Sequence, residues 1–428
     1  MEITEDILQF IWRFRLFRQF PLQTSFGDSL RIVNPGRWNA DAGPDFLMAQ
    51  LEMEGHAWHG HVEVHVHARD WALHGHQHNP AYNAVLLHVV WDGEEAAWLE
   101  NGSLLPCLQL CDLVDASIIA KANTLLKNIN PIPCAYELEA VPSHVQVNVL
   151  ERMAIERLEQ RYAQVLGLLK MMQGDWERLC LALIAAAFGM KVNKQSFIDL
   201  SQILQLNLLR KLGNKPLQVQ SLFFGQAGWL QQEGVKDAYV QELRRAYSFL
   251  ERAHHLSSLS PYQWKFLRMR PYNFPTFKLA QLAALYTGHP GWFAWITHSK
   301  ELAEIQVYVS EVQLPAFWED HYHFEKEAVP HSGAITNDFF HLLVINSFAL
   351  LLFTYGKYTA NQKLMDRALS WLEQVPAERN KLVLPYKKLG MPLQSAMDSQ
   401  AILQLQAAYC DKKRCLHCGI GASLIKGI

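Results

Sequence analysis

The stretch of sequence that decides the fold of the N-terminal part lies between residues 44 and 67. It opens with Pro44-Asp45-Phe46 and closes with Ala57-Trp58-His59-Gly60-His61-Val62-Glu63-Val64-His65-Val66-His67. In the closing segment, valines alternate with histidine and glutamate, which is the two-residue period of a half-buried β-strand. The valines would face a core, and the odd-numbered polar residues would share the opposite face: His59, His61, Glu63, His65 and His67.

A turn signal precedes this strand. Glu54-Gly55 separates it from an apolar segment at 46–53, which predicts a β-hairpin. In that hairpin Asp45 would lie opposite His65, and directly opposed Cβ atoms are about 4.5–5.5 Å apart. Residue 47 would lie opposite Glu63, so Asp45, Glu63 and His65 are predicted to converge. Three apolar residues are expected on the same face as Asp45: Leu47, Ala49 and Leu51.

Two carboxylates and an imidazole at one point are suitable ligands for a divalent cation. Carboxylate oxygens favour Mg²⁺ or Mn²⁺, and additional imidazole, such as that of His61, would favour Zn²⁺. A bound metal can lower the pKa of its water and generate a nucleophile for hydrolysis. We interpret Asp45, Glu63 and His65 as candidate catalytic residues; the alternative is a solvated strand face on which histidine is frequent.

The elements around the hairpin indicate an α+β or α/β core. A helix is predicted from an N-cap at Thr4 to about Phe17, on an apolar stripe at helical spacing. Residues 84–91 form a nearly continuous apolar run, typical of a buried central strand, in which His88 is interpreted as a core histidine. Between the hairpin and this apolar run, His74 and His78 would share a face if their segment is helical.

Beyond a proline-rich segment at 130–133 the sequence becomes helical. Apolar periodicity predicts helices at 142–171, 175–189, 194–211, 236–253, 276–287, 337–354, 360–374 and 397–410. We therefore predict an α/β domain at 1–125, a linker at 126–145, an all-helical domain at 146–402 and a cysteine-bearing C-terminal segment at 403–428.

Composition narrows the class of protein. The formal net charge of the 428 residues is −2, so contact with nucleic acid would require a local basic patch. Neither a signal peptide nor a long uncharged apolar stretch is evident, so no membrane span is expected. Seven cysteines, an odd number in a long chain, do not suggest a secreted disulfide framework. These features favour a cytoplasmic protein with reduced thiols.

The C-terminal segment carries three cysteines at close spacing. Cys410, Cys415 and Cys418 are separated by four and two residues, a spacing at which three thiolates can surround one metal or cluster. A fourth ligand would come from elsewhere, with Cys134 and His417 as the candidates. We interpret this set as a site for an iron–sulfur cluster or Zn²⁺; the alternative is three ordinary reduced cysteines.

One segment of the helical part mixes aromatic and basic side chains. It reads Trp264-Lys265-Phe266-Leu267-Arg268-Met269-Arg270-Pro271. Such interleaving can stack bases and bind phosphate, which makes Lys265, Arg268 and Arg270 candidate substrate-binding residues. The alternative is that the arginines anchor a helix end by hydrogen bonds to carbonyl groups.

Several of these motifs resemble a bacterial family catalogued as domain of unknown function 2851. The motifs are Asn39-Ala40-Asp41-Ala42-Gly43-Pro44-Asp45-Phe46, Gly60-His61-Val62-Glu63-Val64-His65, Tyr82-Asn83, Leu87-His88-Val89-Val90, Phe266-Leu267-Arg268-Met269-Arg270-Pro271 and Asn273-Phe274-Pro275. The resemblance covers essentially the whole chain and implies no activity.

A second resemblance is to restriction-endonuclease-like folds. Pro44-Asp45, followed by Glu63-Val64-His65, is similar to the Pro-Asp…(Asp/Glu)-x-Lys signature of those nucleases, whose element order also matches. The resemblance implies a mixed-sheet core in which Asp45 and Glu63 ligate a metal and position 65 carries the catalytic lysine, which is His65 here. Some nuclease-fold proteins also hold an iron–sulfur cluster through one distant and three clustered cysteines, which Cys134 and the C-terminal triplet resemble.

The leading hypothesis from the sequence is a metal-dependent nuclease that acts on phosphodiesters of DNA or RNA. Asp45 and Glu63 would hold Mg²⁺ or Mn²⁺, and His65 would assist. Two other hypotheses remain open: a non-catalytic scaffold or nucleic-acid-binding protein with a degenerate nuclease-like core, and a zinc hydrolase that uses the histidines.

Overall fold

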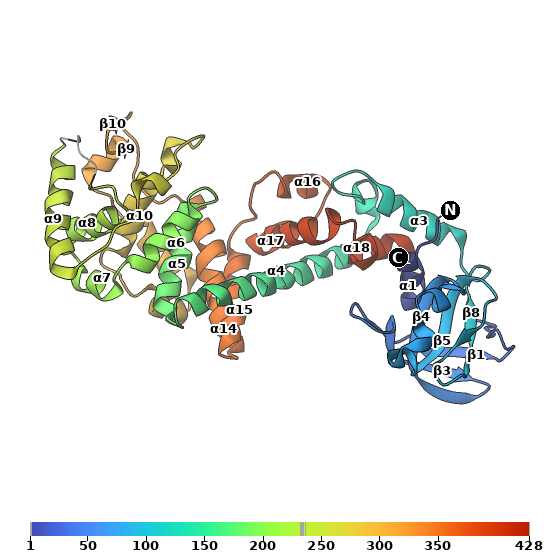
Figure 1. Cartoon of the computed structure of the whole chain (residues 1–428). Coiled ribbons are helices and arrows are strands. Elements are labelled where there is room, and N and C mark those ends of the chain that lie inside the picture. Colours follow the sequence, from blue (N-terminus) through green and yellow to red (C-terminus); the bar gives the residue numbers. More distant parts are fainter. Residues whose placement is uncertain (1, 232–234, 236, 428) are drawn as a thin grey trace. The chain divides into compact units, whose positions relative to one another are not determined.

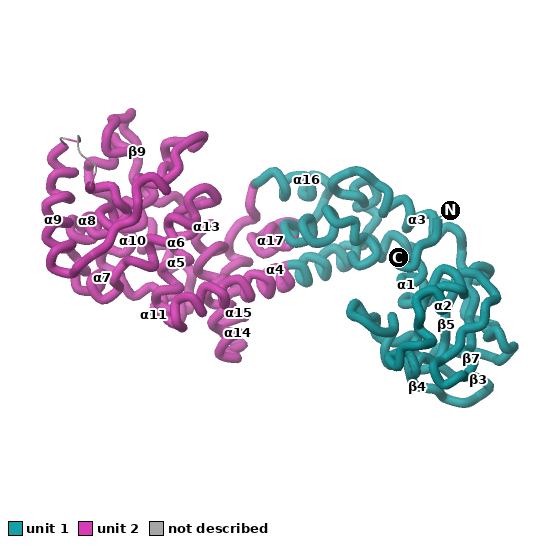
Figure 2. The backbone as a smooth tube through the Cα atoms, viewed as in Figure 1, with its two compact units in different colours: residues 1–153, 380–392, 402–428 teal, residues 154–379, 393–401 magenta. Residues whose placement is uncertain are grey.

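The computed structural model describes residues 2–427 except 232–234 and 236. The chain forms two compact units (Figure 2). Unit 1 comprises residues 1–153, 380–392 and 402–428, and unit 2 comprises residues 154–379 and 393–401. The cysteine-bearing C-terminal segment, which we predicted as a part of its own, therefore belongs to the same unit as the N-terminal sheet.

Unit 1 is built on a mixed six-stranded sheet with the strand order β1-β3-β4-β5-β8, and β2 pairs with β3 as well. The strands are β1 (Leu30–Asn34), β2 (Arg37–Trp38), β3 (Phe46–Met53), β4 (His56–His67), β5 (Val85–Asp92) and β8 (Cys107–Gln109), and a separate ribbon joins β6 (Ala97–Trp98) to β7 (Leu104–Leu105). β3 and β4 form the predicted antiparallel hairpin, whereas β4, β5 and β8 run parallel. The α+β class predicted from the sequence is confirmed.

The register of the hairpin differs from the prediction. Phe46 pairs with Val62 and Ala49 pairs with Gly60, so the pairing shifts between them at a β-bulge. Met48, within this bulge, has a left-handed φ of 58°. The pairing is already displaced by one residue at the turn, where Met53 pairs with His56, and the extra residue displaces it by one more, so that Asp45 lies level with Glu63 and not with His65. The bulge also exchanges the two faces of β3.

The exchange of faces corrects a second prediction. Ala49 and Leu51 are buried in the hydrophobic core, on the face opposite to Asp45. Without the bulge, Asp45 would have pointed into that core. The bulge thus allows one strand to supply apolar residues to the core and a carboxylate to the other face of the sheet.

Helices cover the core face of the sheet. α1 (Glu5–Phe14) begins at the predicted N-cap, where the Thr4 hydroxyl accepts a hydrogen bond from the Ile7 N–H. α1, α3 (Ala116–Lys127) and the C-terminal α18 (Gly419–Lys426) contribute to one core with the strands. Val62 and Val64 lie fully buried in it, as predicted, so Glu63 and His65 must point away from it.

Unit 2 is helical, as predicted (Figure 1). Its helices are α5 (Trp176–Gly189), α6 (Lys194–Ile203), α7 (Leu206–Leu212), α8 (Pro216–Gln226), α9 (Ala238–His254), α10 (Pro275–Tyr286), α11 (Trp292–His298), α12 (Leu302–Ser310), α13 (Asn337–Leu343), α14 (Ala349–Tyr358) and α15 (Gln362–Gln374), with a short ribbon of β9 (His321–His323) and β10 (Lys326–Glu327). α4 (Ser143–Met171) and α17 (Ala396–Leu405) each contain residues of both units, and α16 (Val383–Lys388) belongs to unit 1.

One helical run has the length and apolar composition that a membrane span requires. It extends over Asn337–Tyr358, where α13 and α14 are joined by a π-helical turn at Val344–Phe348, and 78% of its most apolar window is buried inside the protein. The core helix of a soluble protein can have the same length and apolar composition, and most of this run is buried in the protein.

Candidate metal centre

Asp45 and Glu63 are locked to each other through the backbone. The Asp45 N–H donates to Glu63 Oε2 at 2.9 Å, and the Val64 N–H donates to Asp45 Oδ2 at 3.0 Å. Each carboxylate thus accepts a hydrogen bond from the strand that carries the other. This reciprocal arrangement fixes both side chains at the edge of the hairpin with little rotational freedom.

Four histidines gather beside this pair, and we call His65, His74, His76 and His88 the histidine cluster. His65 Nε2 lies 3.0 Å from His74 Nδ1 and 3.3 Å from His76 Nε2. On the other edge of the same ring, His65 Nδ1 lies 2.8 Å from His88 Nε2. One donor atom each from His65, His74 and His76 lies within 4.8 Å of the other two, so these three histidines have the spacing of metal ligands.

Glu63 joins the carboxylate pair to the histidine cluster. Its Oε1 atom lies 3.4 Å from His76 Nε2 and 3.7 Å from His65 Nε2. The Glu63 carboxylate therefore lies beside two of the three clustered imidazoles, those of His65 and His76. Ligands at about 2.0–2.1 Å from a tetrahedral metal are separated by roughly 3.3 Å. The separations from His65 Nε2 to His74 Nδ1 and to His76 Nε2, 3.0 and 3.3 Å, are close to this value.

Hydrogen bonding between imidazoles alone does not satisfy this arrangement. A neutral imidazole has one N–H donor and one acceptor nitrogen. His65 Nε2 faces two other ring nitrogens at hydrogen-bond distance, and a single nitrogen can donate to only one of them. A cation that accepts a lone pair from each nitrogen resolves this conflict, so the donor set fits a transition metal such as Zn²⁺ or Mn²⁺.

A third carboxylate, that of Glu5, comes from α1. Gln9 of the same helix lies between Glu5 and the carboxylate pair: its side chain donates a hydrogen bond to Asp45, and its Nε2 atom lies 3.5 Å from Glu5 Oε1. Gln9 Oε1 also accepts a hydrogen bond from Trp38 Nε1 at 3.2 Å. Burial raises the pKa of Glu5, and the neighbouring His74 opposes that shift. The first turn of α1 therefore brings Glu5 into the electrostatic field of the centre.

Burial leaves the centre without its usual charges. Burial raises the pKa of Asp45 to about 7, and the nearby Glu5 carboxylate adds to the rise. Burial raises the pKa of Glu63 to about 9, and the nearby Asp45 carboxylate adds to that rise. Burial lowers the pKa of His65 to about 2, that of His76 to about 4 and that of His88 to about 3. At neutral pH the Glu63 carboxyl group is therefore protonated and the Asp45 carboxyl group partly so, beside neutral imidazoles, and a divalent cation would displace these protons.

The segment after β4 forms the other wall of the centre. Asp70 Oδ2 accepts from the His67 N–H at 3.0 Å and starts α2 (Asp70–Leu73), whose Trp71 is buried and donates from Nε1 to the Trp98 carbonyl. Gly75, at φ 72°, then ends the helix and turns the chain back. Because of this turn, His74 and His76 meet at the centre. His74 and His78 were expected to share a face only in a helical segment; the helix ends before Gly75, and His78 is exposed.

The other predicted site residues lie apart from this centre. The ring of His61 accepts the Met48 N–H at the bulge through Nδ1, at 3.3 Å, and is not among the three clustered histidines. Lys265, Arg268 and Arg270 are exposed in unit 2, on an irregular segment before α10. Sequence reasoning did not single out Glu5 or His76 as a site residue. The crowding of histidines between 56 and 88 was the signal that could have pointed to His76.

A cationic cavity of about 330 Å³ lies elsewhere in unit 1. It is lined by Arg13, Arg152 and Arg414 together with Trp38 and His417. The rings of Trp38 and His417 are in contact, with centroids 4.7 Å apart. α1 carries Glu5 at its start and Arg13 near its end, so at 1.5 Å per residue the two positions are about 12 Å apart along the helix.

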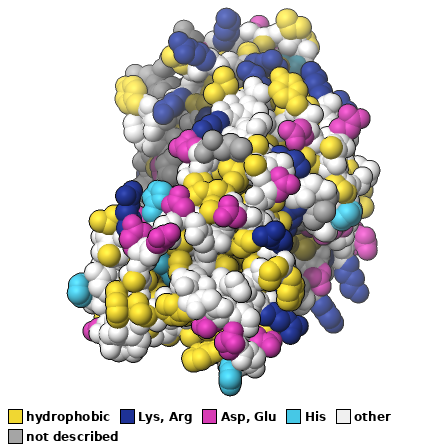
Figure 3. Space-filling model, turned by 90° about the vertical axis from the view of Figure 1, so that its right-hand side faces the viewer, with side chains coloured by type: hydrophobic (Ala, Val, Ile, Leu, Met, Phe, Trp, Pro, Cys, Tyr) yellow, Lys and Arg dark blue, Asp and Glu magenta, His cyan; other side chains and the backbone are white. Residues whose placement is uncertain are grey.

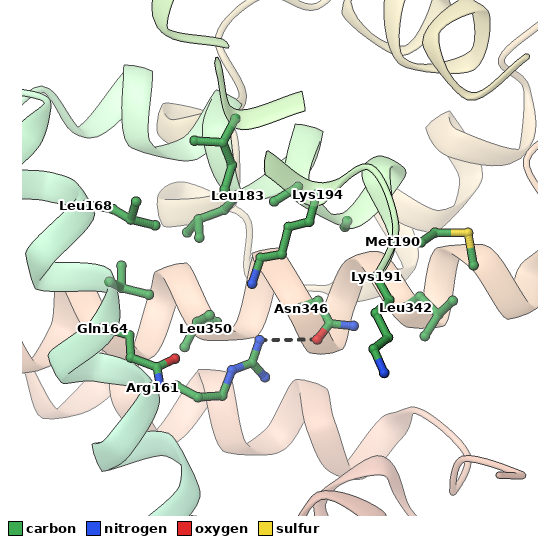
Figure 4. Close-up of a pocket in the computed structure, with 14 residues that line it drawn as sticks. Arg161, Gln164, Leu168, Leu183, Met190, Lys191, Lys194, Leu342, Asn346 and Leu350 are labelled. Carbon is green, nitrogen blue, oxygen red and sulfur yellow. Dashed lines mark hydrogen bonds between the residues drawn. The ribbon is translucent and has the colours of Figure 1, made fainter. Parts of the chain in front are cut away.

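A further cavity, of about 390 Å³, lies within unit 2 and is shown in Figure 4. Arg161, Lys191 and Lys194 line it among apolar side chains, and Arg161 donates to the Asn346 side chain at 3.2 Å. Burial lowers the pKa of Arg161 to about 10. None of the residues predicted as ligands or substrate contacts lines this cavity.

Comparison with known protein families gives one match. The model of a family described as proteins of unknown function (DUF2851) matches residues 5–381. The chain belongs to this family. No curated protein and no solved structure matches the chain. The family resemblance stated from the sequence motifs is thus confirmed, and the match includes both Glu63 and the whole histidine cluster.

Proposed function

We propose that the protein is a metal-dependent hydrolase that cleaves phosphodiesters of nucleic acid at the centre in unit 1. The observation that carries this proposal is the grouping of His65, His74 and His76 at the spacing of metal ligands, with Glu63 Oε1 beside His65 and His76. When bound there, a divalent metal supplies a water of lowered pKa and polarises a phosphoryl oxygen. Imidazole ligands favour Mn²⁺ or Zn²⁺ over Mg²⁺, which revises the preference expected from two carboxylates.

The surrounding residues have separate tasks in this proposal. His88, hydrogen-bonded to His65 Nδ1, fixes the ring so that Nε2 faces the ligand set. Asp45 holds Glu63 through its backbone N–H and lies beside it with Glu5 and Gln9. With a pKa raised to about 7, the Asp45 carboxyl can take or give a proton near neutral pH.

The cationic cavity is the proposed contact for the substrate backbone. Its three arginines attract phosphate, and Trp38 offers a ring on which a base can stack. On the face shown in Figure 3, basic and acidic side chains are interspersed. We therefore expect a few local phosphate contacts and a modest salt dependence. The seven free cysteines favour a reducing, cytoplasmic location.

A specific observation favours a non-catalytic alternative. The nuclease signature has a lysine where this chain has His65, and burial lowers the pKa of His65 so far that it carries no positive charge at neutral pH. A degenerate core that binds nucleic acid without cleaving it would have the same geometry. Turnover, and not binding, must therefore decide between the two.

The test is hydrolysis by the purified full-length protein. Single-stranded DNA, double-stranded DNA and RNA are incubated with Mn²⁺, Zn²⁺ or Mg²⁺, and the wild type is compared with Glu63→Gln and His76→Ala. His78→Ala is the matched control, because His78 is exposed and lies two residues from His76. Cleavage lost in the two variants and kept in the control supports the proposal. Equal cleavage by all four proteins, or none by the wild type with any metal, contradicts it.

A further inference from the structure

Two segments far apart in the sequence bring four cysteines together in unit 1. Cys134 follows the proline-rich segment, and Cys410, Cys415 and Cys418 lie in the C-terminal segment. Side chains of the C-terminal segment hold the proline-rich one: Gln406 Nε2 donates to the Pro131 carbonyl at 3.1 Å, and Lys413 Nζ donates to the Asn130 carbonyl at 3.0 Å. These contacts close a loop of more than 270 residues onto Cys134.

Each thiol of the C-terminal segment is positioned by its local backbone. Cys410 ends a π-helical turn at Gln406–Cys410, and its Sγ accepts from the Tyr386 hydroxyl at 3.3 Å. Cys415 and Cys418 flank a tight turn in which the Cys418 N–H donates to the Cys415 carbonyl at 3.2 Å. Cys418 is also the N-cap of α18.

The turn that follows aims hydrogen-bond donors at sulfur. The backbone N–H groups of Ile420 and Gly421 donate to Cys418 Sγ. A Cβ at Gly421 would lie 2.3 Å from the Cys415 carbonyl oxygen, so this close approach requires glycine. Donors directed at a buried sulfur stabilise a thiolate, which is the form that binds metal.

Cys410, Cys415 and Cys418 are buried in unit 1, and Cys134 is half-buried in the same unit. Cys415 belongs to the core beneath the sheet, and Cys134 packs against that core. All four thiols are free. His417, the rival ligand at the sequence level, instead contacts the Trp38 ring in the cationic cavity.

We propose that Cys134, Cys410, Cys415 and Cys418, which we call the cysteine cluster, are the four ligands of an iron–sulfur cluster. The separation of the C-terminal three by four and two residues is the one found in plant-type ferredoxins, where a fourth cysteine comes from a distant segment. The cluster ties the C-terminal segment to the residues that follow the N-terminal sheet. It is a structural site, separate from the histidine cluster.

The experiment is metal analysis of the full-length protein purified without oxygen. We expect brown protein with bound iron and acid-labile sulfide, and we expect both to be lost in Cys134→Ser and in Cys415→Ser. Cys111→Ser is the matched control, because Cys111 is a free, half-buried cysteine of the same unit outside the cluster. Circular dichroism of each variant shows whether iron is lost from a folded chain.

Three outcomes overturn the proposal. They are wild-type protein that holds no iron even after reconstitution with iron and sulfide, zinc bound in place of iron, and iron retained by Cys134→Ser but lost from Cys415→Ser. None of these readouts involves hydrolysis. Glu63→Gln is expected to keep its iron, so failure of the proposed hydrolase and failure of the iron–sulfur site are distinguishable.

Discussion

The histidine cluster and the cysteine cluster are two candidate metal sites of one unit, assembled in opposite ways. The ligands of the first come from residues 63–76, within one strand and the turn that follows it. The proposed ligands of the second come from position 134 and from positions 410–418. All of unit 2 lies between these two positions in the sequence. The first therefore depends on local turn geometry, whereas the second depends on closure of the whole chain.

The largest expected effect is a loss of hydrolytic activity at the histidine cluster without a loss of iron from the cysteine cluster. Glu63→Gln removes the carboxylate that joins Asp45 to the histidine cluster, so we expect phosphodiester cleavage to fall by at least about a hundredfold. Iron content should not change. Glu52→Gln is the control, because Glu52 is a half-buried residue of the same strand that pairs with Arg31 and not with the centre. Loss of iron together with activity would show that the two sites are not independent.

The next effect is a loss of thermal stability caused by a change in the cysteine cluster, without a change in metal binding at the histidine cluster. Cys134→Ser should release iron and lower the melting temperature, because the C-terminal segment loses its covalent tie to residue 134. The affinity of the histidine cluster for Mn²⁺, measured by calorimetry on the folded variant, should remain within about twofold, since its ligands are local. A loss of Mn²⁺ binding as large as the loss of iron would contradict the separation.

The third effect is a pH dependence of the histidine centre. The pKa values of Asp45 and Glu63 are raised to about 7 and about 9, so the stability that their protonated forms contribute is present at low pH and is lost as pH rises through these values. Because a metal must displace the same protons, the rise in melting temperature caused by Mn²⁺ should grow from about pH 6 to about pH 9. Glu63→Gln should flatten this profile. A rise that is equal at all pH values in the wild type would argue against protons at the ligands.

A fourth, smaller effect tests the local turn. Gly75→Ala places a side chain at φ 72° in open space, so we expect a loss of about 1 kcal/mol of stability and a several-fold lower affinity for Mn²⁺. Gly174→Ala is the matched control, because that glycine also has a left-handed φ in open space but lies in unit 2. It should lose similar stability without affecting the metal. Unchanged affinity in Gly75→Ala would mean that the turn does not position His74 and His76.

The smallest effect concerns the cationic cavity, which includes a residue between the clustered cysteines. Arg414→Gln should weaken the binding of single-stranded DNA a few-fold and reduce its salt dependence by about one phosphate contact. Lys412→Gln, an exposed residue of the same segment outside the cavity, is the control. Equal weakening by both variants would indicate a general charge effect and not a defined cavity.

The sequence by itself determined the alternation of β4, the N-cap at Thr4, the mixed class of the fold and most of the helices, because these follow from local periodicity and capping. It also placed Asp45, Glu63 and His65 in one region. The sequence did not determine the register of the hairpin, because the bulge at Met48 depends on how β3 packs against both the core and β4. Only the tertiary structure decided that Asp45 lies beside Glu63 and that a left-handed turn at Gly75 brings His76 to the site. It also decided that the C-terminal segment holds the residues before Cys134. Each of these contacts depends on a backbone conformation or a chain closure that no short segment encodes.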